Sequence, residues 1–378
     1  MIVEKILNTY EPAACAISEQ FFQQLRSEKR FAIWGTGSAA KYAVEQCNLR
    51  GLQPICICDS FQHNAGEQFC GIPLISGDTF FDAYSPCLTL ISCHSDYKIP
   101  DLFEKHGNPC LTWDTSMLYV FNGERPYHET LRQNAEIIES VYQSLSDTRS
   151  KKCFENILCY RITTDISFIE EIYSEPMYFG NDVIPQLNCG AFVDCGAFTG
   201  DTLIQFLDTS GCTFEKYYAL EPHREKAALI QKYVEQNNLS NVIVLPVGVW
   251  NEQGILRFQQ SSIGNGFIST TGAAEIAVDT IDNILSGEAP ARARAHTHTQ
   301  AQRGFIKMDI EGSEIPALLG ARSIIQSDHP TLAISVYHRG DDLWEIPALL
   351  LEMNPGYRLY LRHHAHSICE TVCYAKSE

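Results

Sequence analysis

Apolar positions along the first part of the chain fall into short runs separated by glycine turns and helical stretches. The runs at 31–34, "PICICDS", "CGIPLIS" and "PCLTLISCH" have the length of buried strands. The first run passes through Gly35 and Gly37 into a helical stretch at 39–47. Strands that alternate with helices are typical of a parallel sheet. We predict a helical segment over 1–28 and a small Rossmann-like domain over 29–120.

The period of the apolar positions then becomes helical, with Leu131, Ile138 and Leu145 on one stripe. This predicts a helical connector over 121–175. After it come the apolar runs "AFVDC", "KYYAL", "NVIVLPVGVW", "GFIKMDI" and "TLAISVY", which alternate with helical segments, and then "YRLYL" and "SICETVCYA". The first five predict a second doubly wound parallel sheet, and the last two an antiparallel hairpin, within a domain over 176–378. The fold class is therefore α/β, with two doubly wound units.

Two polar segments interrupt this last domain. Residues 288–304 have little apolar content and repeat small and basic residues, which predicts a mobile surface insertion. The sequence "RHHAH", which contains His363, His364 and His366, is interpreted as the solvated turn of the terminal hairpin.

Charge and composition limit the partners. The 378 residues carry 28 basic and 46 acidic side chains, a formal charge of -18, which disfavours nucleic acid. No apolar stretch approaches the roughly 20 residues that span a bilayer. The fifteen cysteines lie mostly in apolar runs, where free thiols behave as core residues, and no signal-peptide pattern is present. We expect a cytoplasmic protein, and a homo-oligomer is compatible with the sequence.

The first glycine turn, "GTGSAA", has the spacing G-x-G-x-x-A, close to the dinucleotide fingerprint. The next strand ends at Asp59, which makes Gly35, Gly37 and Asp59 candidates for holding a nucleotide or nucleotide-sugar. Close packing of the helix on the strand explains the same glycines equally well.

The second glycine turn lies in "FVDCGAFTGDT", where three residues separate Gly196 from Gly200 and Asp194 precedes them. A buried acid before the turn is unfavourable for a pyrophosphate, but it suits a ligand with an ammonium group and a sulfonium, such as S-adenosylmethionine. Glu221 ends the next strand, where a carboxylate can accept hydrogen bonds from ribose hydroxyls. Further candidates for this cofactor site are Asp201, Thr202, Tyr178, Phe179, Gly248 and Trp250, although helix capping explains Asp201 and Thr202 as well.

The strand "GFIKMDI" is expected beside "AFVDC", so Asp309 should emerge next to Gly196. We assign His338 as general base for a hydroxyl acceptor, with Asp309 orienting it or the substrate. In the alternative, Asp309 is the base, or it binds a divalent cation such as magnesium together with Glu311. Lys307 alternates with Asp309 along the strand and, like Glu311, is a candidate for contacting the substrate or a metal. The alternative is that Lys307 neutralises the carboxylates without touching the substrate.

Several of these motifs together resemble the FkbM-type family of class I S-adenosylmethionine-dependent methyltransferases. They are "FVDCGAFTGDT", "ALEP", "VDTIDNIL", "FIKMDIEGSEIPALLGA" and "SVYHRGDDLWEIPALL", in this order within 177–374. The resemblance implies a seven-stranded Rossmann-like sheet and O-methylation of a hydroxyl, often on a sugar or natural product. The insertion at 288–304 departs from the family pattern.

The first domain resembles, with fewer specific motifs, the small Rossmann-like domains that accompany such methyltransferases in polysaccharide-modifying proteins. We therefore expect an O-methyltransferase acting on a saccharide, a glycan precursor or a related metabolite in polysaccharide biosynthesis. Two alternatives remain: an NAD- or nucleotide-sugar-dependent enzyme that uses the first domain, and a non-catalytic scaffold.

Overall fold

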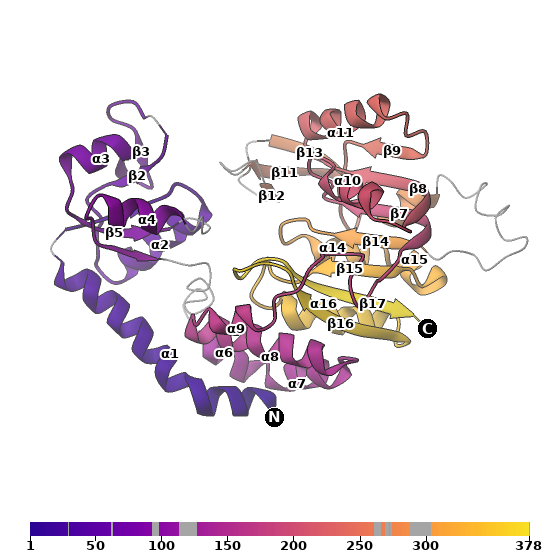
Figure 1. The fold of residues 1–378 in the computed structure, drawn as a ribbon, viewed down its shortest axis with the longest axis horizontal. Coiled ribbons are helices and arrows are strands. Elements are labelled where there is room, and N and C mark those ends of the chain that lie inside the picture. Colours follow the sequence, from indigo (N-terminus) through magenta and orange to yellow (C-terminus); the bar gives the residue numbers. More distant parts are fainter. Residues whose placement is uncertain are drawn as a thin grey trace, which may run out of the picture. The chain divides into compact units, whose positions relative to one another are not determined.

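The computed structural model describes residues 1–28, 30–61, 63–92, 98–112, 127–260, 266–268, 272, 274–286 and 304–377. The chain divides into two compact units (Figure 1). The first takes in the described residues of 1–135 and 155–169, and the second those of 136–154, 170–260 and 265–378. The four-part division inferred from the sequence stays a prediction, and 288–303 lie outside the described residues.

The first unit is built on a six-stranded sheet with the order β3-β4-β2-β1-β5-β6. Its strands are β1 (Phe31–Trp34), β2 (Ile57–Asp59), β3 (Gln68–Phe69), β4 (Ile72–Ser76), β5 (Leu88–Ile91) and β6 (Cys110–Thr112). All neighbouring strands are parallel except β3 and β4. Its helices are α1 (Ile2–Ser27), α2 (Ser38–Leu49), α3 (Gly77–Ala83), α4 (Lys98–Lys105) and α6 (Tyr127–Gln133).

Side chains alternate between two cores on opposite faces of this sheet. Ile33 and Leu90 pack with buried residues of α1 and α2. Trp34 and Ile91, the next residues of the same strands, pack with Phe80 of α3 and with α4. Because successive side chains of a strand point to opposite faces, helices cover both faces, as predicted for a doubly wound sheet.

The second unit contains a seven-stranded sheet with the order β16-β17-β15-β14-β7-β8-β9. Its strands are β7 (Asn188–Cys195), β8 (Thr213–Leu220), β9 (Val242–Leu245), β14 (Phe305–Met308), β15 (Thr331–Ser335), β16 (Tyr357–His363) and β17 (Thr371–Ser377). The strands from β9 to β15 are parallel, and β17 is antiparallel to both β15 and β16. The prediction of a seven-stranded α/β sheet with a terminal antiparallel hairpin is confirmed.

The predicted connector contains three helices, α7 (Ala135–Ser144), α8 (Thr148–Thr163) and α9 (Ser167–Glu170). The second unit takes in 136–154 of this segment, whereas 155–169 belong to the first unit. The helices that follow the strands of the second unit are α10 (Asp201–Asp208), α11 (Arg224–Gln236), α12 (Ile281–Ser286), α14 (Glu314–Leu319), α15 (Arg322–Asp328) and α16 (Asp342–Met353). Within the described residues, no helix is long and apolar enough to cross a membrane.

A four-stranded sheet, which the sequence analysis missed, has the order β10-β13-β11-β12. It consists of β10 (Gly248–Val249), β11 (Gly254–Gln260), β12 (Gly266–Ile268) and β13 (Ala274–Asp279). The run "NVIVLPVGVW" was interpreted as one strand, yet it divides between β9 and β10. Pro246, which has no N–H for a ladder, lies between the two, and the chain turns there through a bond from Val247 N to Leu245 O of 2.9 Å.

The interpretation of "RHHAH" as a solvated turn is wrong for its first residues. His363 is the last residue of β16, pairs with Thr371 of β17 and is fully buried. Arg362 is buried as well, and its guanidinium contacts the carboxylates of Asp147 at 2.8 Å and Asp182 at 2.6 Å. His366 alone of the three histidines is exposed. The strand continues into the polar sequence because these side chains find buried partners.

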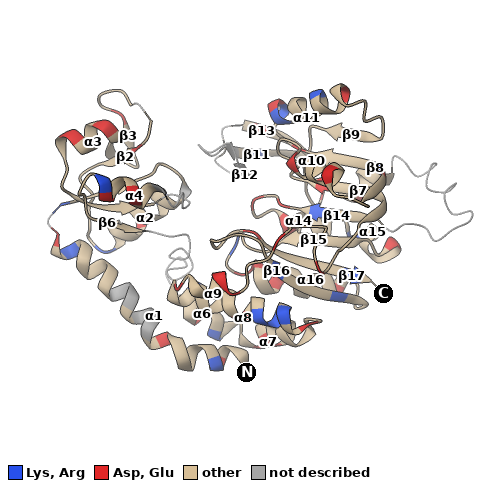
Figure 2. Cartoon of the chain, viewed as in Figure 1, with Lys and Arg blue, Asp and Glu red and all other residues tan. Residues whose placement is uncertain are grey.

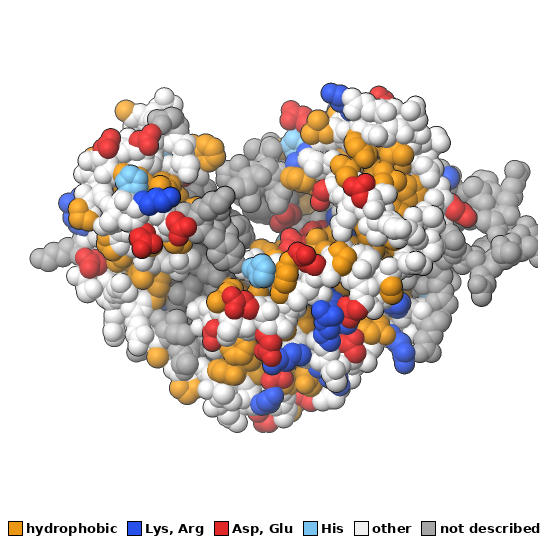
Figure 3. All heavy atoms as spheres, viewed as in Figure 1, with side chains coloured by type: hydrophobic (Ala, Val, Ile, Leu, Met, Phe, Trp, Pro, Cys, Tyr) orange, Lys and Arg blue, Asp and Glu red, His pale blue; other side chains and the backbone are white. Residues whose placement is uncertain are grey.

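Hydrophobic side chains also gather on the surface of the second unit around α10, as Figure 3 shows. Ile204 and Leu207 of this helix and Leu229 of α11 are exposed. Nothing in the structure indicates what covers them, and homo-oligomer formation stays a prediction.

The second glycine turn lies in close contact with the end of the neighbouring strand β14. Gly196, directly after β7, has a φ of +78°, and a Cβ added there would lie 2.1 Å from the backbone oxygen of Asp309. Any side chain at this position would therefore separate the end of β7 from the end of β14.

We expect Gly196→Ala to lower the free energy of unfolding by at least about 2 kcal/mol, because it adds left-handed strain to a backbone clash. Urea denaturation measures the change. The matched control is Gly254→Ala, where an added Cβ meets nothing within 4 Å and the expected change is under about 1 kcal/mol. Equal losses in the two variants would contradict this account.

Candidate functional site

The candidate site lies at the carboxyl edge of the seven-stranded sheet, where β7, β8, β14 and β15 end. β7 lies between β8 and β14, so the chain leaves it in one direction and returns on its other side. Ligands of open α/β sheets bind at such a switch point. Figure 2 shows acidic residues grouped near α10 and α14, the helices that begin at this edge.

Beneath the edge, Lys307 and Asp194 form a buried ion pair between adjacent strands. The Lys307 Nζ lies 3.0 Å from the Asp194 Oδ1, with 4 % and 0 % of the two side chains exposed. The same ammonium donates a hydrogen bond of 2.9 Å to the Gly196 carbonyl. Burial by itself lowers the pKa of Lys307, but the charges of Asp194 and Asp309 raise it above its usual value. Lys307 thus neutralises carboxylates and also fixes the glycine turn.

Asp194 was predicted to contact the cofactor, but the geometry does not bring it to the surface of the site. Its second oxygen accepts a hydrogen bond of 2.7 Å from the Tyr217 hydroxyl, and its side chain has no exposed area. In this arrangement Asp194 acts on the turn through Lys307, and a ligand would not touch it. The sequence could not distinguish these roles, because an acid before a glycine turn fits both.

Asp309 is the carboxylate that reaches the edge. It accepts hydrogen bonds of 3.0 Å from the hydroxyls of Tyr178 and Tyr337, and 22 % of its side chain is exposed. Burial raises its pKa, but the charges of Lys307 and His338 and the two hydroxyls outweigh burial and hold the pKa below its usual value. Asp309 is therefore an ionised acceptor at neutral pH.

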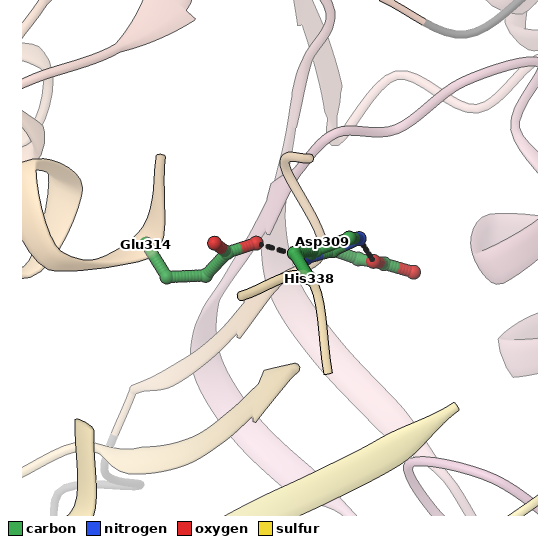
Figure 4. Close-up of side chains that lie close together, drawn as sticks. All are labelled: Asp309, Glu314 and His338. Carbon is green, nitrogen blue, oxygen red and sulfur yellow. Dashed lines mark ion pairs between the residues drawn. The ribbon is translucent and has the colours of Figure 1, made fainter. Parts of the chain in front are cut away.

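His338 lies between carboxylates, as Figure 4 shows for Asp309 and Glu314. Its Nδ1 is 2.9 Å from Glu314 Oε1, and its Nε2 is 3.4 Å from Asp309 Oδ1 and 3.7 Å from Glu311 Oε2. Burial lowers its pKa, but the charge and contact of Glu314, followed by Asp309 and Glu311, raise the pKa to about 10. At neutral pH the ring is an imidazolium with no lone pair, so the structure argues against His338 as general base.

Asp309, Glu314 and His338 are also the described residues that could hold a metal ion, with one ligand atom from each lying within 4.8 Å of the others. One imidazole and two carboxylates suit a transition metal better than magnesium, which prefers oxygen ligands. A metal would have to displace a proton of the His338 ring and replace its ion pair with Glu314. Glu311, the second predicted magnesium ligand, is not in this group, and a divalent cation stays a prediction.

Glu221 follows β8 and is held firmly by the turn after β7. Its two oxygens accept hydrogen bonds from Phe198 N at 3.0 Å and His223 N at 2.8 Å, and burial raises its pKa. Each carboxylate oxygen has two lone pairs, so Glu221 keeps acceptor capacity for a ligand. Phe198 has a φ of +49° and a ring that is 38 % exposed, with Lys226 Nζ 3.9 Å from the ring centroid. An exposed aromatic ring beside a strand-end carboxylate gives this edge the surface that a nucleoside needs.

The other predicted cofactor residues divide by burial. Gly200 has a φ of +89° and precedes α10, and Asp201 is exposed in its first turn. Thr202 is buried under the same turn, and Phe179 is fully buried in the hydrophobic core, so neither borders the edge. Tyr178 is also buried, and its hydroxyl reaches the site through Asp309.

Gly248 has a packing reason of its own. A Cβ there would lie 3.2 Å from Val278 Cγ1 and 3.7 Å from Pro222 Cβ, next to the half-buried Trp250. This crowding explains the glycine without a ligand.

Sequence reasoning missed Glu370, which directly precedes β17. Its Oε1 lies 3.4 Å from the Tyr337 hydroxyl, whose single hydrogen also serves Asp309. Its Oε2 is buried and has no hydrogen-bond partner within the described part of the chain. Its φ is +64°, a conformation that a non-glycine residue adopts only when its surroundings impose it. Burial, followed by the charge of Asp309, raises the pKa of Glu370 to about 7. An acid in the apolar run "SICETVCYA" was the one available signal.

The predicted nucleotide-binding residues Gly35, Gly37 and Asp59 are not part of the candidate site in the second unit. The structure brings the three together in the first unit, at the carboxyl edge of the six-stranded sheet.

Comparison with known proteins finds one family model and several solved structures that are similar to this chain. Residues 194–367 match the family model of the methyltransferase FkbM domain. The crystal structure of methyltransferase FkbM from Methylobacillus flagellatus KT covers 99 % of this chain and 100 % of its own, with 24 % identity and a TM-score of 0.66. A SAM-dependent methyltransferase from Aquifex aeolicus covers 50 % and 82 %, with 16 % identity and a TM-score of 0.27, too low to support a statement about this chain. The search of curated proteins found no match to this chain.

The raised pKa of His338 predicts a definite pH dependence of stability. A folded pKa of about 10, above the usual 6.5, gives a contribution that is fully present below pH 6.5 and is lost as pH rises toward 10. We expect His338→Gln to cost roughly 3–5 kcal/mol near pH 6, because it leaves buried carboxylates uncompensated. Urea unfolding of both proteins from pH 6 to 10 should show the difference shrinking. A difference that does not vary with pH would contradict the ion pairs.

The buried Lys307–Asp194 pair predicts a non-additive loss of stability. Lys307→Met leaves the Asp194 carboxylate without its cation and should lower the free energy of unfolding by about 3–5 kcal/mol. The double variant with Asp194→Asn removes that stranded charge, so it should recover part of the loss. Denaturation of Lys307→Met, Asp194→Asn and the double variant measures the coupling. If the two changes simply add, the pair is not what stabilises the turn.

Proposed function

We propose that this protein is an S-adenosylmethionine-dependent O-methyltransferase, because residues 194–367 match the family model of the methyltransferase FkbM domain. Its acceptor is the hydroxyl of a saccharide, a glycan precursor or a related metabolite. The observation that carries the proposal is the adjacency of Gly196, Asp309 and Glu221 at the switch point of the sheet. Buried thiols such as Cys195 support a reducing compartment, and the proposal includes the cytoplasm.

The donor set of this edge suits a cationic nucleoside. The carboxylates of Asp309, Glu311 and Glu221 lie around the edge of the sheet. The ammonium of Lys307 is already paired with the buried carboxylate of Asp194. A pyrophosphate would meet mainly negative charge, whereas a sulfonium would be attracted. S-adenosylmethionine, when bound, supplies a methyl group on a good leaving thioether. Glu221 would hold the ribose hydroxyls, and Phe198 would border the base.

The acceptor hydroxyl needs orientation and a route for its proton. Asp309 is ionised and partly exposed, so it can accept a hydrogen bond from the hydroxyl and orient it. In place of His338, which is an imidazolium at neutral pH, we assign the base to Glu370. A carboxylate with a pKa of about 7 and an oxygen without a partner can take a proton near physiological pH. His338 then contributes a fixed positive charge that holds Asp309 and Glu314.

Cofactor binding is tested by calorimetry with S-adenosylhomocysteine. We expect one site, a rise in melting temperature, and an affinity that falls about tenfold in Glu221→Gln through loss of a charge-assisted hydrogen bond. The matched control is Glu235→Gln, an exposed position at the far end of α11, which should bind like the wild type. No heat on folded protein would end the proposal.

Methyl transfer is tested with labelled cofactor and a panel of glycans, nucleotide-sugars and small polyols. On an acceptor that is methylated, Glu370→Gln should lower kcat roughly 10²–10⁴-fold while leaving the affinity for S-adenosylhomocysteine unchanged. Glu352→Gln, at an exposed ion pair of α16, is the control. Unchanged kcat in Glu370→Gln would remove Glu370 as base, and a panel without product would remove the proposed acceptor class.

A further inference from the structure

The first unit contains a glycine turn that methyl transfer leaves unused. Beyond the proposed function, we propose that this turn binds the diphosphate of a nucleoside diphosphate ligand, at Gly35–Gly37 and the N-terminus of α2. Three independent features of the unit support this assignment: an uncapped helix, a glycine without a packing role and a buried hydroxyl without a partner.

The helix offers unused donors. β1 ends at Trp34, and the 12-residue α2 begins at Ser38, with Gly37 as its N-cap residue. No side chain of the described residues caps this end, and the first turn contains no acidic residue. The first backbone N–H groups of a helix have no acceptor within it, and they carry the positive end of its dipole. Such an end binds phosphate groups when the chain before it lets them approach.

Gly37 is not a packing glycine. A Cβ added to Gly37 would meet no described residue within 4 Å, and the Gly37 φ of -84° is accessible to any residue. Gly77 of the same unit shows the opposite case, because a Cβ there would lie 2.6 Å from the Trp34 ring. Close helix–strand packing therefore does not explain the second glycine of "GTGSAA". The open space over Gly37 is what a diphosphate that approaches the backbone requires.

Ser92 supplies the second polar group. It follows β5, and its N–H donates to Trp34 O at 2.8 Å, so the ladder between β1 and β5 extends to Gly35 and Ser92. Trp34 and Ile91 face the core of α3 and α4. By alternation, Ser92 faces the α2 side, across the bare backbone of Gly35. The Ser92 side chain is fully buried, and its hydroxyl oxygen has no hydrogen-bond partner among the residues that the structure describes.

A buried hydroxyl without a partner loses free energy, so the place of Ser92 on the α2 side of the sheet indicates a ligand there. The position also matches the topology, since β1 lies between β2 and β5 at the switch point of this sheet.

Asp59 supports the turn and does not compete for the ligand. It ends β2, and its carboxylate accepts hydrogen bonds of 2.8 Å from Thr36 Oγ1 and from Phe61 N. The His63 Nε2 lies 2.7 Å from the same carboxylate. Through Thr36, Asp59 fixes the middle of the glycine turn. The predicted contact of Asp59 with a nucleotide is thereby revised to a positioning role, with most of its acceptor capacity already used.

Calorimetry on the full chain tests the assignment, with UDP, ADP, NAD and UDP-glucose as titrants and inorganic pyrophosphate as competitor. We expect at least one nucleoside diphosphate to bind with a Kd below about 1 mM and to be displaced by pyrophosphate. NAD and UDP-glucose distinguish a dinucleotide from a nucleotide-sugar. No binding of any titrant to folded protein would overturn the proposal.

Two variants locate the site. Gly37→Ala adds a methyl group where nothing clashes, so the unfolding transition should persist while affinity falls at least about tenfold, because the phosphates can no longer approach. Ser92→Ala should lose a similar factor through one hydrogen bond. Ser27→Ala, exposed at the end of α1, is the control. Unchanged affinity in both variants would overturn the assignment. S-adenosylhomocysteine, titrated into each variant, reports the other unit, so the two proposals fail separately.

Discussion

The buried ion pair of Lys307 with Asp194 is the interaction on which the candidate site depends. The two charges lie on adjacent parallel strands with almost no exposed area, where neither could remain without the other. The lysine also holds the Gly196 carbonyl, at the point where the β7 turn comes closest to Asp309. The pair therefore joins the two strand ends into one rigid edge. Asp309, Tyr178 and Glu221 take their positions from that edge.

Above this pair, the charges divide into an ionised set and a titratable group. His338, drawn between carboxylates, is held as a cation and keeps Asp309 ionised. Burial, followed by the charge of Asp309, raises the pKa of Glu370 despite the opposing charges of His338 and Lys307. Carboxylates whose environments push their pKa values apart are suited to different roles in one reaction. A histidine at a strand end is thus a structural charge here, and the group that titrates near neutrality is an acid.

The two glycine turns of the chain share a local design and differ in electrostatics. Both follow a buried strand and open a helix at the carboxyl edge of a parallel sheet. The turn at Gly196 is surrounded by carboxylates, which favours a cation. The turn at Gly35 adjoins an uncapped helix end whose first turn has no acid, which favours an anion. The two proposals therefore assign ligands of opposite charge to the same backbone design, and the side chains at neighbouring strand ends distinguish the two turns.

The sequence by itself determined the two α/β sheets, the strand ends that carry Gly196, Glu221 and Asp309, and the terminal hairpin. These follow from apolar periodicity and from the rule that crossovers place the fourth strand beside the first. It did not determine the charge of His338, the role of Glu370, the burial of His363 or the division of "NVIVLPVGVW" into two sheets. A pKa depends on which charges lie within a few ångströms, and His338 takes its charge partners from positions 309, 311 and 314, on another strand end. Such distances between remote segments exist only once the chain has folded, so only the tertiary structure could decide them.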